Sequence, residues 1–165
     1  MTGFDWATLS AAKNARPDAV PEMIRHTLRV LEDLLEDADH ICTFTLADGP
    51  YTDDAATSVN ALLPNGCRVS RLEPVASWSE QLRQVLPGLF VPARQPAAWA
   101  EHGAPRQLVE ALAEWALALM GQLWPESARS WTVEVETDHW YEAVWFDLAV
   151  RADNRISLLH LGITD

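Results

Sequence analysis

Lysine and cysteine are scarce in this chain. A single lysine, Lys13, accompanies eleven arginines, and 24 acidic residues outnumber the 12 basic ones, for a formal charge of −12. Repulsion from phosphate groups therefore argues against nucleic acids and anionic membrane surfaces as partners. The two cysteines, Cys42 and Cys67, are too few for a disulfide framework. We expect both thiols to be reduced and buried.

Long hydrophobic runs are also missing. No stretch approaches the roughly 18 apolar residues that cross a bilayer, and the N-terminus has neither the basic nor the apolar segment of a secretory signal. These absences predict a cytoplasmic protein without a membrane span. The length of 165 residues, with 48% hydrophobic, suits one domain over residues 1–165.

Motifs that would identify a reaction are absent from the sequence. The seven glycines form neither G-x-G-x-x-G nor a P-loop, and no G-x-S-x-G is present. No two of the five histidines have the i, i+4 spacing that directs two imidazoles to one zinc. His40 is interpreted as a partner of the C-terminal end of the preceding helix. The sequence thus predicts no metal, no cofactor and no catalytic residue, and it favours a protein that is not an enzyme.

Two segments have strong helical periodicity. Ile24, Leu28 and Leu31 begin an apolar stripe over residues 21–37, and a broader apolar face extends over residues 105–124. Turn-forming and capping residues delimit weaker helices. These are expected over residues 4–14, from Thr52 to about Leu63, and from the Ser77 and Glu80 capping box to Pro87.

Strand patterns dominate the end of the chain. Trp131, Val133 and Val135 alternate with polar residues. Two further strands, over residues 139–151 and 155–163, flank a tight turn at Asp153-Asn154. Earlier strands are expected over residues 41–46, closed by a turn at residues 48–50, and over residues 67–72. The sequence predicts an α+β fold, with helices packed on one face of a mainly antiparallel sheet that has a C-terminal three-stranded meander.

The segment from Asp138 to Glu142 places an imidazole, a phenol and two carboxylates close together in sequence. These groups can perform general acid–base chemistry. On an extended strand, however, His139 and Tyr141 would share one face while Asp138 and Glu142 share the other. We therefore interpret the segment as the start of a strand and not as a catalytic pair.

Acidic side chains gather where basic ones are missing, between Arg29 and Arg68 and between Arg129 and Arg151. The eight tryptophans include Trp140 and Trp145, which have opposite parity on one predicted strand, so at least one faces outward. An exposed indole beside carboxylates is typical of a protein-binding hot spot. The predicted partner-binding residues are Asp37, Asp39, Asp53, Asp54, Glu134, Glu136, Trp140 and Glu142.

These features favour a non-catalytic acidic module, monomeric or homodimeric, that binds a basic protein. In size, acidity and lack of a catalytic motif the chain resembles bacterial immunity proteins, a resemblance that implies neutralisation of a basic toxin or enzyme. A second hypothesis is a small-molecule enzyme or ligand-binding protein with a pocket near the Pro87–Pro105 loop. Its polar groups would be His102, His139, Tyr141 and Glu142. A third is an adaptor or homodimer subunit.

Overall fold

The protein was described from a computed structural model, which covers residues 19–36, 40–90, 106–139 and 141–164. Several sequence predictions lie outside these residues. They concern the helix over residues 4–14, most of the Pro87–Pro105 loop with His102, and the surface residues Asp37, Asp39 and Trp140.

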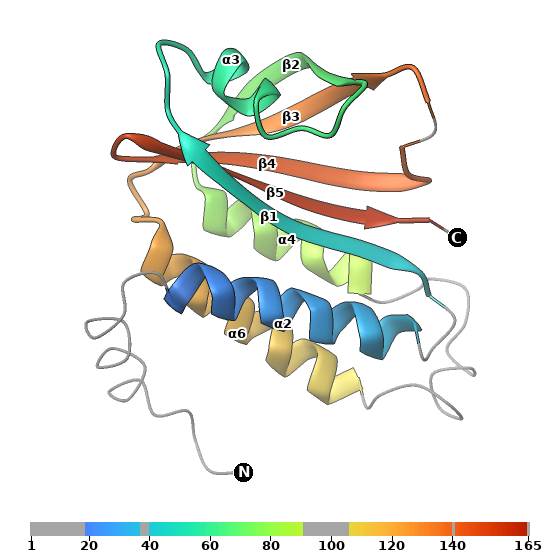
Figure 1. The fold of residues 1–165 in the computed structure, drawn as a ribbon. Coiled ribbons are helices and arrows are strands. Elements are labelled where there is room, and N and C mark those ends of the chain that lie inside the picture. The colour runs from blue at the N-terminus through green and yellow to red at the C-terminus, as the bar shows by residue number, and fades with distance from the viewer. Residues whose placement is uncertain (1–18, 37–39, 91–105, 140, 165) are drawn as a thin grey trace.

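A five-stranded antiparallel sheet forms the centre of the molecule, with strand order β1-β5-β4-β3-β2 (Figure 1). The last three strands follow one another as a meander, as predicted, and the two earlier strands form its margins. The strands are β1 (Cys42–Pro50), β2 (Cys67–Val75), β3 (Arg129–Thr137), β4 (Val144–Ala152) and β5 (Arg155–Ile163).

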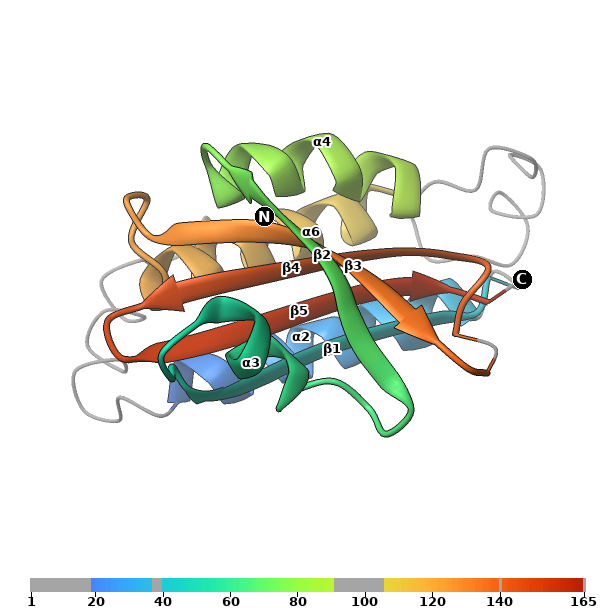
Figure 2. The same cartoon turned by 90° about the horizontal axis from the view of Figure 1, so that it is seen from above.

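Three long helices cover one face of this sheet, and one short helix lies on the other (Figures 1 and 2). The long helices are α2 (Ala19–Glu36), α4 (Trp78–Phe90) and α6 (Arg106–Leu123). The short helix α3 (Ala55–Asn60) begins where the Asp54 carboxylate accepts the Thr57 N–H at 2.9 Å. This arrangement confirms the predicted α+β class.

Apolar residues form two cores, one on each side of the sheet. The larger core joins the stripe of α2, including Ile24 and Leu31, to inward residues of β4 and β5 such as Leu148 and Leu159. The smaller core lies under α3 and is formed by Val59, Val133, Ala149, Ile156 and Leu158. Residues of β4 and β5 thus alternate between the helix layer and the opposite face.

Two tryptophans that periodicity did not place clearly are in the larger core. Trp78 and Trp124 are each 1% exposed, and their rings pack edge to face with the ring centroids 5.3 Å apart. The indole nitrogens donate to the Pro125 carbonyl and to the Ser157 hydroxyl, each at 3.2 Å. Buried indoles that find acceptors for their N–H groups serve packing.

Several predicted boundaries were wrong, including the end of β2, which lies at Val75 and not at residue 72. Strand β1 continues through the expected turn to Pro50, because Gly49 and Pro50 keep their pairing with β5. Helix α4 extends past Pro87 to Phe90, since proline so near the end of a helix costs one backbone hydrogen bond. Strand β4 begins at Val144, not at residue 139, so the preceding residues do not alternate as a strand would.

Both margins of the sheet are protected from further pairing. Along β1, the Glu32 carboxylate accepts the Phe44 N–H, and Arg25 Nε donates to the Leu46 carbonyl at 2.9 Å. Along β2, Asn60 Oδ1 accepts the Val69 N–H at 2.8 Å, and a bulge interrupts the strand before Pro74. Side chains and irregularities of this kind blunt strand edges.

The β4–β5 hairpin turns at Asp153-Asn154, as predicted, and Asp153 has a positive φ of 55°. His40 donates its backbone N–H to the Leu35 carbonyl at 3.1 Å, in keeping with its predicted place at a helix end. Its ring contacts the Leu89 carbonyl at the end of α4 instead.

No helix within the described ranges is long and apolar enough to cross a membrane.

Candidate functional site

Four titratable side chains meet on the sheet face that carries α3, at the end of the sheet where β4 begins and β5 ends. We call them the His160 network: Tyr141, Glu142, Asp147 and His160. The side chains of Asp147, Glu142 and His160 are only 0%, 9% and 10% exposed. Burial of this many polar groups requires that each has a partner.

The imidazole of His160 lies between two carboxylates. An ionised carboxylate can only accept, so Nδ1–H donates to Asp147 Oδ1, at 2.8 Å. On the other side of the ring, Nε2 is 3.8 Å from Glu142 Oε1. The Tyr141 hydroxyl donates to Asp147 Oδ2 at 3.3 Å and is 3.2 Å from Nδ1. Asp147 therefore fixes the orientation of the imidazole.

Strand register explains how these residues meet. Asp147 and His160 are direct partners across β4 and β5, so their side chains leave the same face of the sheet. Glu142 arrives from the connection between β3 and β4, which is tied to β5 by the bond from Ala143 N–H to the Ile163 carbonyl at 2.9 Å. A glycine at position 162 makes room for it.

Glu142 lies directly over Gly162. A Cβ atom at Gly162 would be 2.8 Å from both Glu142 Cγ and His160 Nε2, closer than real Cβ contacts allow. The Thr164 hydroxyl donates to Glu142 Oε2 at 2.7 Å. The inward position of Glu142 thus depends on a missing side chain, one hydroxyl and the imidazole of His160.

Tyr141 connects the network to the protein surface. Its ring packs edge to face against the Trp145 indole, with the ring centroids 5.4 Å apart, and its centroid is 5.1 Å from that of the His160 ring. Burial, and then the negative charge of Asp147, raise the pKa of Tyr141 well above the ordinary value of a phenol. The hydroxyl accordingly stays protonated and serves as a hydrogen-bond donor.

Exposed apolar side chains gather at this same end of the sheet. Val144 and Trp145, the first residues of β4, are 57% and 39% exposed, and Ile41, just before β1, is 51% exposed. Ile163 pairs with both Val144 and Cys42, which places these strand ends side by side. Neighbouring strand residues point to opposite faces, so Trp145 shares the α3 face with the His160 network and Val144 does not. We call Ile41, Asp138 and Trp145, together with the largely buried Glu142, the sheet-end surface.

A hollow of about 440 Å³ adjoins this surface, where β2 begins and β3 ends. Its lining includes Cys67, Glu136 and Asp138. Cys67 lies near enough to Tyr141 to influence the phenol. Asp138 is largely exposed and accepts a hydrogen bond from His139 Nδ1 at 2.9 Å, which lowers the pKa of the Asp138 carboxyl. The lining of the hollow thus carries two carboxylates and, in Arg68, one guanidinium.

The predicted acidic residues do not form one surface. Glu136 forms an ion pair with Arg68 at 2.9 Å, and Glu134 lies 3.7 Å from Arg71. The hydrogen bond and the charge of Arg68 lower the pKa of Glu136. Asp53 and Asp54 lie at the opposite end of the sheet, because Tyr51 N–H donates to the carbonyl of Asn154 in the β4–β5 turn. Of the described residues that were predicted, Glu136 and Glu142 lie nearest the hollow and the exposed indole.

Sequence reasoning missed Asp147, His160 and Trp145 as site residues. A signal for the first two was present, since Asp147 is six residues before Asp153 and His160 is six residues after Asn154. A tight turn at that dipeptide makes them cross-strand partners. His139 and Tyr141, placed together by strand alternation, have separate partners in the structure.

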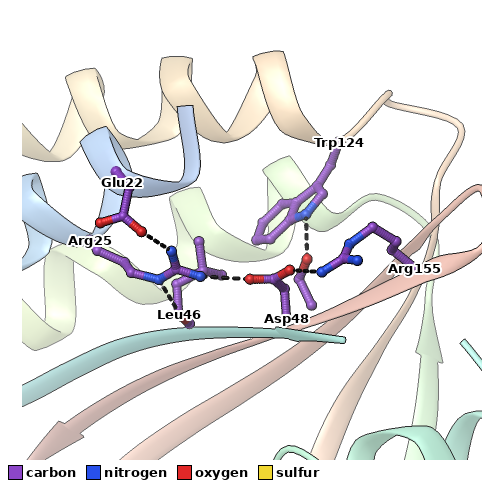
Figure 3. Close-up of polar contacts among 7 residues, drawn as sticks. Glu22, Arg25, Leu46, Asp48, Trp124 and Arg155 are labelled. Carbon is purple, nitrogen blue, oxygen red and sulfur yellow. Dashed lines mark hydrogen bonds and ion pairs between the residues drawn. The ribbon is translucent and has the colours of Figure 1, made fainter. Parts of the chain in front are cut away.

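A second polar cluster lies on the helix side of the sheet, near the β4–β5 turn (Figure 3). Asp48 binds Arg25 Nη2 at 2.6 Å and also binds Arg155, and Arg25 reaches Glu22 at 2.5 Å. Burial alone would raise the pKa of Asp48, but the hydrogen bonds and charges of the two arginines outweigh it and lower that pKa. A hollow of about 380 Å³, lined in part by Trp124 and Ser157, lies beside this cluster.

In the part of the chain that the structure describes, no three His, Cys, Asp or Glu side chains are placed to hold a metal ion together. Comparison of the chain with protein-family models, with curated proteins and with solved structures found no match.

Proposed function

We propose that this protein is a binding module that receives a cationic segment of a basic protein on its sheet-end surface. The observation that carries the proposal is Trp145, an exposed indole held edge to face by the half-buried ring of Tyr141. A rigid, partly exposed aromatic residue supplies contact area at little entropic cost. Neutralisation of a toxin, in the manner of an immunity protein, is one biological use of such a module.

Charge selects the kind of partner. Asp138 is largely exposed and lines the adjoining hollow, and Glu142 belongs to the network that supports the indole through Tyr141. A formal charge of −12 on the whole chain adds a long-range attraction for basic proteins. A lysine or arginine side chain can place its methylene groups on Trp145 and its charge near these carboxylates.

An enzyme remains the second candidate, because Asp147 orients the imidazole of His160 as an orienting carboxylate does for a general base. A general base must reach the proton that it removes. Nε2 of His160 faces Glu142, and the side chain is 10% exposed. This enclosure supports the binding module over the acid–base site.

The test is affinity capture from the source lysate with three immobilised proteins: the wild type, Trp145→Ala and Leu108→Ala. Leu108 is 44% exposed on α6, so its variant is a matched loss of surface apolar area away from the sheet end. We expect a basic protein to be captured by the wild type and by Leu108→Ala, and to be lost with Trp145→Ala. Its association rate should fall as salt increases. Equal capture by all three proteins would refute the proposed surface.

A further inference from the structure

The inward position of Glu142 creates a problem of charge. Two carboxylates, Asp147 and Glu142, flank one imidazole where the three side chains are at most 10% exposed. An uncompensated charge in such a place is costly. When both carboxylates are ionised, a proton on each nitrogen of the His160 ring gives each carboxylate an N–H to face, and the two carboxylates share the single positive charge of the ring.

The contacts of Glu142 change when that proton is lost. The Nε2 lone pair then faces Glu142 Oε1 across 3.8 Å, which is repulsive. Among the described residues, the Thr164 hydroxyl then remains as the hydrogen-bond donor to this carboxylate, through Oε2. One neutral hydroxyl is a weak counterpart for a buried carboxylate, so the side chain is driven toward solvent.

We propose that Glu142 is a proton-controlled arm of the sheet-end surface, latched inside by the imidazolium of His160 and released to bind an arginine or lysine side chain. The inference rests on the proposed function, and it adds the partner group and the regulation of the site. The proton leaves His160 Nε2 for the solvent as the cation of the partner becomes the counter-charge of Glu142.

The other groups that face His160 do not supply this proton. Asp147, on β4, holds Nδ1–H, and Tyr141 keeps its hydroxyl proton because its pKa is raised. Thr45, the pairing partner of His160 on β1, carries no charge. One proton shared by His160 and Glu142 therefore controls the latch, whichever of the two holds it at a given moment.

Gly162 offers a way to open the latch without a change of pH. Alanine at this position would bring Cβ to 2.8 Å from both Glu142 Cγ and His160 Nε2, so the two side chains cannot keep their places and the contact between them is broken. Gly121, on the exposed surface of α6, has open space where a Cβ would be added. Gly121→Ala is thus the matched control for Gly162→Ala.

The experiment measures binding of a hexa-arginine peptide by titration calorimetry. The two pH values are about 5.5 and about 7.5, because imidazoles change charge in this range. Buffers of different ionisation enthalpy are used so that the number of protons released on binding can be counted. The proteins are the wild type, Gly121→Ala, Gly162→Ala, His160→Gln and Trp145→Ala. For the wild type and Gly121→Ala we expect affinity to rise with pH, by at most tenfold per pH unit, with release of up to one proton. Gly162→Ala should bind at both pH values as tightly as the wild type does at the higher one. His160→Gln should lose most of the pH dependence.

The outcomes separate the two proposals. If wild-type affinity is the same at both pH values, or if Gly162→Ala keeps the wild-type pH dependence, the latch is refuted and the sheet-end surface stands. If Trp145→Ala binds the peptide as tightly as the wild type at both pH values, the proposed surface is refuted as well.

Discussion

The two polar clusters, on opposite faces and near opposite ends of the sheet, balance their charges differently. Asp48 is held between Arg25 and Arg155, whose guanidinium groups keep their charge at any ordinary pH. In the His160 network, two carboxylates depend on one imidazole, a group that can gain or lose its charge. The comparison teaches that a fixed counter-charge suits a structural link, whereas a titratable one makes the same kind of contact responsive to pH.

The largest effect should come from breaking the buried pair in the network. Asp147→Asn removes the carboxylate that accepts from His160 Nδ1–H, and the Asp147 side chain is fully buried. We expect the free energy of unfolding to fall by about 3 kcal/mol, measured by urea denaturation at neutral pH. Glu80→Gln, at an exposed site on α4, is the control. A loss as small as that of the control would show that the network is solvated, not buried.

The same substitution at Asp48 should have a smaller effect. Asp48→Asn removes the counter-charge of two arginines, but these side chains are partly exposed and water compensates them. The expected loss is about 1–2 kcal/mol near neutral pH. An effect larger than that of Asp147→Asn would reverse the comparison.

The pH dependence of Asp48 follows from its lowered pKa. Because the folded state lowers that pKa, the unfolded chain binds more protons in acid, and the stabilisation is lost as pH falls through the folded-state pKa. The wild type and Asp48→Asn should thus differ above about pH 4 and converge in stronger acid. The free energy of unfolding of both proteins is measured by urea denaturation across this pH range. A difference between the two proteins that stays constant at all pH values would contradict the prediction.

The smallest effect should come from Tyr141→Phe. This change removes one hydrogen bond to Asp147 and keeps the ring against Trp145. We expect a loss of about 1 kcal/mol in urea unfolding. Peptide binding should be kept, since the surface indole retains its support. Loss of binding at unchanged stability would instead place the phenol in direct contact with the partner.

Much of the fold was accessible from the sequence because local patterns were strong. The stripe that includes Ile24 and Leu31 predicted α2, and the alternation of Val133 and Val135 predicted β3. Turn-forming residues were less reliable guides to where an element ends. Gly49 and Pro50 look like a turn, yet pairing with β5 along the margin of the sheet outweighs that local preference.

The site was harder to predict because its residues meet through register and not through proximity in sequence. His160 lies in a largely apolar strand, where the pattern indicated only burial. Its partner Glu142 comes from an irregular connection whose path no periodicity describes. Only the turn at Asp153-Asn154, which was predicted, carried the information that joins Asp147 to His160.

The protected margins of the sheet limit how this molecule can associate. Arg25 and Glu32 occupy backbone groups along β1, and the bulge and Pro74 interrupt β2. A visiting strand therefore finds no continuous row of amides and carbonyls on which to extend the sheet. In the proposed function, side chains at the ends of the strands are therefore the groups that a partner would contact, and the blunted margins oppose polymerisation through backbone pairing.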